Sequence, residues 1–259
     1  MTSTTTESLR SELADGILRL TITRPRRMNA IDLTTMKTLS DAVKAAGDDE
    51  RVRTIVVTGE GSAFCTGADL AAGAADPQDP GVVMDTANEL VRTIASVPVP
   101  VVAAVNGPAA GVGVSIALAA DLTYAAESAY FLLAFVNIGL MPDGGASLLV
   151  PAAIGRARAA EMALLGERVS AQDADRFGLV ARTLPDAELA AHVDAVASRT
   201  ASGPRRALEL TKRALNASTL GELDTALARE KDGQVELLGS ADFAEGAMAM
   251  LDKRPARFA

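Results

Sequence analysis

The chain has 259 residues and a formal charge of −8 at pH 7, because 33 Asp and Glu residues outnumber 25 Lys and Arg residues. This acidic balance, without a dense run of Lys and Arg, argues against sequence-independent binding of nucleic acid. One Cys and one His exclude an internal disulfide and a metal site built on several Cys or His ligands.

Hydropathy indicates a globular protein outside the membrane. The hydrophobic fraction of 49% is enough for a packed core, and the aromatic fraction of 3% means a core of Ala, Val and Leu. The first residues, MTSTTTES, lack the basic and apolar stretches of a signal peptide. The apolar runs are interrupted before the roughly 20 residues that a membrane span needs. We therefore expect a soluble, cytoplasmic protein with no membrane partner.

The N-terminal part of the chain alternates between strand and helix patterns. Its first eight residues are polar and predicted to fray. Residues 9–23 have the pattern of a β-hairpin around Asp15-Gly16. Asp32 is expected to cap a helix that ends at Gly47, and the next apolar run, TIVVTG (54–59), predicts a buried strand.

The middle of the chain repeats the passage from strand to helix. Residues 71–81, with two Pro and two Gly, are predicted to form the most mobile loop. A helix is expected over about 82–96, and a Val-rich strand then enters a helix of small residues by 120. Residues 123–135 are predicted to be further strand.

From residue 146 onward, Ala-, Leu-, Glu- and Arg-rich helical periods run almost unbroken to Leu251. We divide the chain into an α/β core at 1–195 and a C-terminal helical region at 196–259. The last helix has Phe243, Ala247, Met250 and Leu251 on one face, which predicts packing on a second subunit or over a ligand pocket.

Two segments combine a buried strand, a glycine turn and the start of a helix. Such a turn leaves backbone N–H groups free to bind a developing negative charge. The first is Gly67-Ala68-Asp69, for which the simpler interpretation is a helix capped by Asp69. The second is AVNGPAAGVGVS (104–115), whose GxG lacks the third glycine of a dinucleotide-binding loop.

The second segment also invites comparison with a serine hydrolase. Ser115 lies in GVSIA, which lacks the last glycine of a nucleophile elbow. The one histidine, His192, falls in a predicted helix and is interpreted as a surface or half-buried helix residue. A catalytic triad is therefore the weaker hypothesis. Cys65, beside the first loop, is interpreted as a packing residue.

Two further segments carry charged side chains. Asp143, in Pro142-Asp143-Gly144-Gly145, is either the cap of the next helix or a carboxylate base over a pocket. The run Arg24-Pro25-Arg26-Arg27 either binds phosphates or forms a solvated turn.

These segments occur in one order: LTITRPRRMNAI, FCTGADL, AVNGPAAGVG, IGLMPDGGASLL, and then GRARAAEMALLGERVSAQDADRFGLV. The chain resembles the enoyl-CoA hydratase/isomerase family, also called the crotonase family, nearly from end to end. The resemblance implies an α/β fold, a crotonase-like spiral of ββα units with a C-terminal helical trimerisation region. It also implies an acyl-CoA substrate, with coenzyme A entering as part of the thioester and no separate cofactor, and a homotrimer or a dimer of trimers.

Matching the family motifs residue by residue assigns roles. The resemblance implies that the N–H groups of Ala68 and Val112 stabilise the enolate of the thioester and that Asp143 is the remaining candidate base. It implies that Arg26 contacts the phosphate end of coenzyme A. The other residues that the resemblance places at the substrate are Thr66, Ala68, Asp69, Leu70, Gly111, Ser115 and Phe135.

The sequence departs from the family at the two glutamates of a hydratase, whose positions hold Ser115 and Phe135. Neither side chain can serve as a carboxylate base. We therefore favour a double-bond isomerase, in which Asp143 moves a proton between carbons two and four. The alternatives are an acyl-CoA binding protein without catalysis, and a hydratase that recruits other acids, namely Asp69, Asp76, Asp79 or Asp85.

Overall fold

The predicted N-terminal hairpin forms and gains a third strand. The computed structural model describes residues 2–76 and 78–259. β2 (Leu9–Ala14) and β3 (Ile17–Ile22) pair antiparallel around Asp15-Gly16. The prediction that the N-terminus frays is wrong for β1 (Thr2–Thr5), because its backbone pairs antiparallel with the free edge of β2.

The main sheet has seven strands in the order β1-β2-β3-β4-β5-β7-β10. From β3 onward all neighbours are parallel. The central strands carry apolar side chains on both faces because helices cover both sides, as is usual for parallel sheets. The strands beyond the hairpin are β4 (Thr54–Gly59), β5 (Val101–Val105), β7 (Leu122–Ala126) and β10 (Arg182–Leu184).

Three helices bury apolar stripes in the main core. α1 (Leu33–Asp48) begins at Asp32, whose Oδ1 accepts a hydrogen bond from the Thr35 N–H at 2.8 Å, and it ends one residue beyond Gly47. α3 (Pro80–Ser96) packs against α1. α4 (Val112–Ala119) consists of small and apolar residues and is buried almost all round.

The predicted mobile loop at 71–81 is largely helical. α2 (Leu70–Ala75) occupies its first half, and α3 begins at Pro80, so only residues between them connect the two helices. Asp69 and Asp79 cap these helices through the N–H groups three residues later, at 3.1 Å in each case. Local capping therefore overrides the Pro and Gly content. Pro77 lies outside the described residues.

The strand predicted over 123–135 is two strands in two different sheets. β7 ends at Ala126, and β8 (Tyr130–Leu132) joins a small sheet with β6 (Ala109–Ala110) and β9 (Val169–Ser170). The polar pair Glu127-Ser128 separates the strands, and the Ser128 N–H is satisfied by Asp186 at 3.0 Å. A 3-10 helix, η2 (Ala134–Ile138), follows β8.

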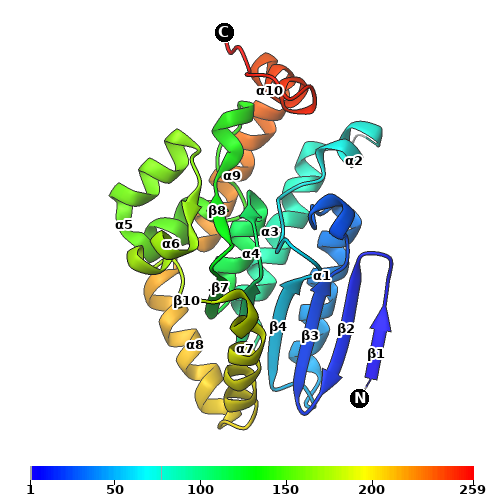
Figure 1. The fold of residues 1–259 in the computed structure, drawn as a ribbon, viewed down its shortest axis with the longest axis vertical. Coiled ribbons are helices and arrows are strands. Elements are labelled where there is room, and N and C mark those ends of the chain that lie inside the picture. Colours follow the sequence, from blue (N-terminus) through cyan, green and yellow to red (C-terminus); the bar gives the residue numbers. More distant parts are fainter. Residues whose placement is uncertain (1, 77) are drawn as a thin grey trace.

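Helices dominate the second half of the chain, interrupted by β9 and β10. α7 covers one face of the main sheet, over a cluster that includes Val56, Val102 and Val193, whereas α1, α3 and α4 contribute to the larger core (Figure 1). The bounds are α5 (Ala146–Leu165), α6 (Ala171–Phe177), α7 (Asp186–Ala201), α8 (Arg205–Thr219), α9 (Leu223–Leu238) and α10 (Ala241–Leu251). The division at residue 195, which falls inside α7, stays a prediction.

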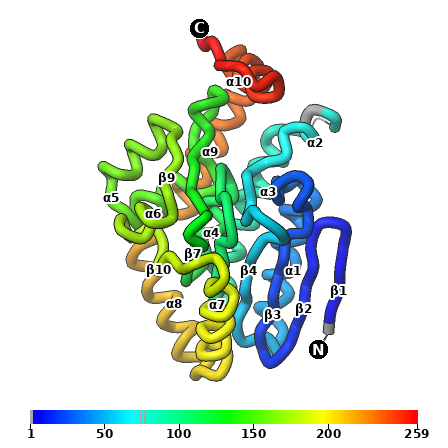
Figure 2. Tube along the Cα trace, in the orientation of Figure 1, coloured from blue at the N-terminus to red at the C-terminus, as the bar shows by residue number. Residues whose placement is uncertain are grey.

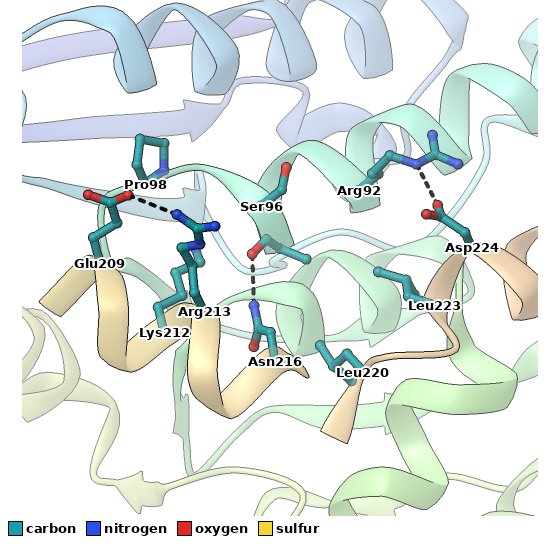
Figure 3. Close-up of a pocket in the computed structure, with 11 residues that line it drawn as sticks. Arg92, Ser96, Pro98, Glu209, Lys212, Arg213, Asn216, Leu220, Leu223 and Asp224 are labelled. Carbon is teal, nitrogen blue, oxygen red and sulfur yellow. Dashed lines mark hydrogen bonds and ion pairs between the residues drawn. The ribbon is translucent and has the colours of Figure 1, made fainter. Parts of the chain in front are cut away.

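α8 is anchored by a buried lysine. The Lys212 Nζ lies 2.9 Å from Asp121 Oδ2 and donates to the main-chain oxygen of Ile94 at 3.0 Å. The pair joins α8 to the start of β7 and the end of α3, beside a surface cavity of about 410 Å³ (Figure 3). Around that cavity, Arg92 pairs with Asp224 at 2.8 Å and Arg213 with Glu209 at 3.7 Å.

α10 lies at the opposite end of the molecule from the N-terminal strands (Figure 2). Its buried residues are Gly246 and Ala249, and a Cβ on Gly246 would lie 2.5 Å from the Cα of Ile138 in η2. Met250 and Leu251 are exposed, whereas Phe243 and Ala247 of the same predicted face are half-buried, so only part of that face packs on this chain. None of the described helices is both long enough and apolar enough to cross a membrane.

Candidate active site

The first glycine turn leaves one backbone donor unused. Gly67 has φ +101°, a conformation that side chains disfavour, and its main-chain oxygen accepts from the Ile31 N–H at 2.9 Å. The Asp69 N–H in turn donates to the Ile31 oxygen at 2.9 Å, and the two bonds form a short parallel β-bridge between Ile31 and Ala68. Ala68 lies between them, exposed, and its N–H has no acceptor within residues 2–76 and 78–259.

An ion pair holds this turn in place. Arg24 Nη2 contacts Asp69 Oδ2 at 2.9 Å and Asp32 Oδ2 at 3.1 Å. The other Asp69 oxygen caps α2 by accepting from the Ala72 N–H at 3.1 Å. The side chain of Asp69 is only 4% exposed, so it is a structural anchor with both oxygens engaged.

The second glycine turn lies directly beside the first. Gly111 has φ +53° and ψ −130°, and its N–H donates to the Leu132 oxygen at 3.0 Å. Val112 is the first residue of α4, and no described residue accepts its N–H. A Cβ on Gly67 would lie 3.2 Å from the Ala110 oxygen and 3.8 Å from the Gly111 Cα. Two N–H donors without a protein acceptor thus lie on adjoining loops.

Asp143 lies in the turn between η2 and α5, and this turn contacts the start of α4. The Ser115 hydroxyl donates to the main-chain oxygen of Asp143 at 3.0 Å. A Cβ on Gly144 would lie 3.1 Å from Ser115 Oγ and 3.4 Å from Val112 Cγ2. The Asp143 turn and the Val112 donor are therefore neighbours across the first turns of α4.

The Asp143 carboxyl group is held on one side and open on the other. Its Oδ2 accepts from Gln234 Nε2 at 2.7 Å. No described residue donates to Oδ1, and this oxygen is not among the fully buried unpaired atoms, so it is free of a protein partner. Burial raises the pKa of Asp143 to about 7; the Gln234 hydrogen bond opposes this rise and the Glu230 charge adds to it.

Glu230 and Gln234 on α9 are the site residues that sequence reasoning missed. Glu230 is fully buried and accepts from the N–H groups of Gly145 at 2.6 Å and Ser147 at 2.7 Å. Glu230 and Gln234 continue, at helical spacing, the buried stripe that Leu223 and Leu227 begin. Polar residues on an apolar stripe were the signal available in the sequence.

The other predicted site residues occupy different environments. Phe135 is 7% exposed, and its Cζ lies 3.8 Å from where a Gly111 Cβ would be. Ser115 is fully buried beneath the Asp143 turn. Thr66 donates to the Met28 oxygen at 3.1 Å, and Leu70 is the first residue of α2.

Arg26 is exposed in the short 3-10 helix η1 (Pro25–Arg27). With Arg24, Arg27 and Asp32 it lines a cleft of about 550 Å³ beside the first glycine turn. Glu7 also lines this cleft, whose charges are therefore mixed, and the Arg24–Asp69 ion pair links it to the loop that carries Ala68.

The structure separates Ser115 from the only histidine. His192 is half-buried on α7, as the sequence predicts, and its ring packs edge-on against Tyr124 of β7 at 4.7 Å. The Ser115 hydroxyl is instead bonded to the Asp143 main chain. Cys65 is fully buried, and burial raises the pKa of its thiol to about 12, which fits a packing residue.

Two of the other acids considered for hydration have partners away from this site. Asp79 caps α3, and Asp85 contacts Lys231 Nζ at 2.6 Å. Asp76 is exposed where α2 ends. Asp143 is the acid whose turn touches both Ser115 and Val112.

Comparison with known proteins assigns the chain to a family. Residues 12–259 match the family described as enoyl-CoA hydratase/isomerase. The chain is 43% identical to a probable enoyl-CoA hydratase of Rhodobacter capsulatus, with 97% of each chain covered. It is 38% identical to 1,2-epoxyphenylacetyl-CoA isomerase of Escherichia coli, with 97% of this chain and 98% of the relative covered.

The fold agrees with this assignment. The crystal structure of an enoyl-CoA hydratase from Mycobacterium avium subsp. paratuberculosis superimposes with a TM-score of 0.91 at 48% identity, covering 97% of this chain and 98% of the other. The predicted crotonase-like α/β fold is confirmed. The chain belongs to the enoyl-CoA hydratase/isomerase family of acyl-CoA enzymes.

Proposed function

We propose that the protein shifts a double bond in an acyl-CoA thioester between the 3-enoyl and 2-enoyl positions, with Asp143 as the proton shuttle. The observation that carries the proposal is the unpaired Oδ1 of Asp143, in a turn that contacts Val112, together with the unused N–H groups of Val112 and of Ala68 on the adjoining loop. One carboxylate is sufficient, because the proton taken from one carbon is returned to the other by the same group.

The two donors supply the electrostatic part of the reaction. Removing a proton from the carbon next to the thioester or conjugated to it moves negative charge onto the thioester oxygen. The N–H groups of Ala68 and Val112 bind that oxygen in the charged state. By analogy with other oxyanion holes, each donor contributes about 2.7–4 kcal/mol to lowering the barrier.

The environment of Asp143 suits a base that works near neutral pH. Its pKa of about 7 lets the carboxylate take up a proton and release it again without a large energetic penalty. Phe135, packed against the Gly111 turn, excludes water from this side of the pocket. Ser115 acts on the backbone of the turn and takes no part in proton transfer.

The relatives' names support the chemistry without fixing the substrate. The Escherichia coli relative is named an isomerase of a CoA thioester, whereas the Rhodobacter relative is named a probable hydratase. Hydration is the second candidate for this reason. It needs an acid besides Asp143, and Asp69, the acid next to Ala68, has both oxygens engaged by Arg24 and α2.

Coenzyme A enters as part of the thioester substrate, and the proposed reaction uses no separate cofactor. We assign contact with the phosphate end to Arg26, in the cleft beside the arginine run. Thr66 and Leu70, on either side of Ala68 in the chain, are assigned to the part of the substrate that reaches the donors. The exposed Met250 and Leu251 of α10 support assembly into a homotrimer or a dimer of trimers. Light scattering at micromolar concentration tests this, and a monomer contradicts it.

The test of function is proton exchange followed by NMR. A saturated acyl-CoA such as butyryl-CoA is incubated in D2O with the wild-type protein and with Asp143→Asn. We expect exchange at carbon two in the wild type and a loss of about 10²–10⁴-fold in the variant. Exchange that survives in Asp143→Asn moves the base elsewhere and favours hydration. Binding without exchange in either protein indicates an acyl-CoA binding protein.

A second assay separates the two reactions. A 3-enoyl-CoA is converted by an isomerase to the conjugated 2-enoyl-CoA, whose absorbance is followed directly. Formation of 3-hydroxyacyl-CoA from a 2-enoyl-CoA, measured by chromatography, would overturn the isomerase proposal.

A further inference from the structure

Side chains of α9 bind the turn that carries Asp143 at several points along the turn. Glu230 binds the N–H groups of Gly145 and Ser147, which begin α5, and Gln234 binds the Asp143 side chain. Between them, Gly233 leaves room for Met141, since a Cβ there would lie 2.3 Å from Met141 Sδ. In Figure 1 this orange helix runs beside the green segment that leads into the turn.

Gln234 is 1% exposed and uses both ends of its amide. Its Oε1 accepts from the Met141 N–H at 3.2 Å, and its Nε2 donates to Asp143 Oδ2 at 2.7 Å. The orientation of the amide is determined by this pair, because a backbone N–H can only donate and must face the oxygen. The nitrogen therefore faces Asp143.

This arrangement makes the two Asp143 oxygens different. Oδ2 is tied to a buried amide that cannot rotate without losing a second hydrogen bond, whereas Oδ1 has no donor among the described residues. A base that receives and returns a proton at two carbons needs one free oxygen held at a fixed height over the substrate. The Gln234 amide, on α9, supplies that constraint.

We infer that Gln234 is a positioning residue for Asp143, holding Oδ2 so that Oδ1 alone faces the substrate. The inference rests on the proposed function, in which Asp143 is the base. Gln234 touches no reacting atom and acts only through the carboxylate it binds.

The charged and polar groups around Asp143 make the inference testable by pH. From α9, the Gln234 hydrogen bond favours the charged carboxylate, and Glu230 disfavours it as a like charge. From α4, Ser115 contacts only the main chain of the turn. The positive charge of Arg229 stabilises the negative charge of Glu230. Removing Gln234 and removing the Glu230 charge therefore move the pKa of Asp143 in opposite directions.

The experiment measures carbon-two exchange of butyryl-CoA against pH and substrate concentration. In Gln234→Leu we expect the maximal exchange rate to fall about tenfold or more, KM to change little, and the rising limb of the profile to move to higher pH. In Glu230→Gln the limb moves to lower pH. The matched control is Gln172→Leu, at an exposed position on α6, which leaves rate and profile unchanged.

Structural damage alone gives a different result. If both α9 variants lose rate while the profile stays at the wild-type pH, or if Gln234→Leu keeps the wild-type rate and profile, the inference is overturned. Should Gln234→Leu fail to fold, Gln234→Glu keeps the acceptor for Met141 and puts an oxygen against Oδ2. Its profile must then move to higher pH, and an unmoved profile rejects the inference.

Failure of the proposed function is recognised separately. Exchange that persists in Asp143→Asn rejects Asp143 as the base whatever the α9 variants do. Loss of exchange in Asp143→Asn together with wild-type behaviour of Gln234→Leu leaves the proposed function standing and rejects only the role of Gln234.

Discussion

The two halves of the candidate site are built in different ways. The donors at Ala68 and Val112 come from turns in which a few consecutive residues, with Gly67 and Gly111 at positive φ, set the backbone. The base, Asp143, lies in a turn whose partners are Glu230 and Gln234 of α9 and Ser115 of α4, with Gln234 91 residues further along the chain. The glycines thus set the backbone conformation of the donor turns, although the Arg24–Asp69 ion pair and the Ile31 bridge hold the first turn in place. The side-chain position and the pKa of the base depend entirely on tertiary contacts.

Among substitutions outside Asp143, the largest expected effect tests the donor half of the site. Gly113→Ala places a Cβ 2.1 Å from the Cys65 oxygen, so α4 must move away from the first loop and carry the Val112 N–H with it. We expect carbon-two exchange to fall about 10²–10³-fold, as for the loss of one oxyanion donor. The exchange rate and the melting temperature are measured together.

The control for this variant is Gly73→Ala in α2, where nothing lies within 4 Å of the added Cβ. Here we expect unchanged exchange and a small gain in stability, up to about 1 kcal/mol, because alanine favours a helix. Equal losses of exchange rate in Gly113→Ala and Gly73→Ala would contradict a specific role for the contact between α4 and the first loop.

The pH dependence tests the other half. Asp143 must be deprotonated to accept a proton, and its pKa is raised to about 7. Exchange is expected to be maximal above pH 7 and to fall about tenfold for each pH unit below it. A profile that stays flat down to pH 5 would contradict Asp143 as the base.

Arg24→Met tests the anchor of the first loop. The substitution leaves the Asp69 carboxylate, 4% exposed, without its guanidinium partner. We expect a loss of about 2–4 kcal/mol in the free energy of unfolding, since an uncompensated charge stays largely buried. Urea unfolding measures it, with exposed Arg27→Met as the matched control. A loss no larger than in the control would show that the turn holds without the ion pair.

The smallest effect concerns stability at the base. Asp143 has a folded pKa of about 7, above the ordinary value of 3.8 for an aspartate, so the folded state binds more protons between these two pH values. Its contribution to stability is fully present below pH 4 and is lost as pH rises through 7. Asn does not titrate, so Asp143→Asn should be more stable than wild type by about 1–3 kcal/mol at pH 8.

At pH 4 the two proteins should differ little in stability. Thermal unfolding at both pH values measures the difference. A variant less stable than wild type at pH 8 would show that the charged carboxylate is not under strain in the fold.

Local features of the sequence were sufficient for much of this protein. The hairpin at Asp15-Gly16, the Asp32 cap and the buried strand at 54–59 follow from turn chemistry, capping and apolar runs over a few residues. The order of the glycine turns, the arginine run and the PDGG segment predicted the family, which the comparisons confirm.

Tertiary structure decided what local patterns leave open. Pairing with β2 ordered the N-terminal strand, which its polar sequence alone did not predict. The partners of Asp143 belong to this class as well. The burial that sets its pKa and the amide that holds its Oδ2 exist only once α9 lies against the 139–147 turn, because both depend on contacts between residues distant in the chain.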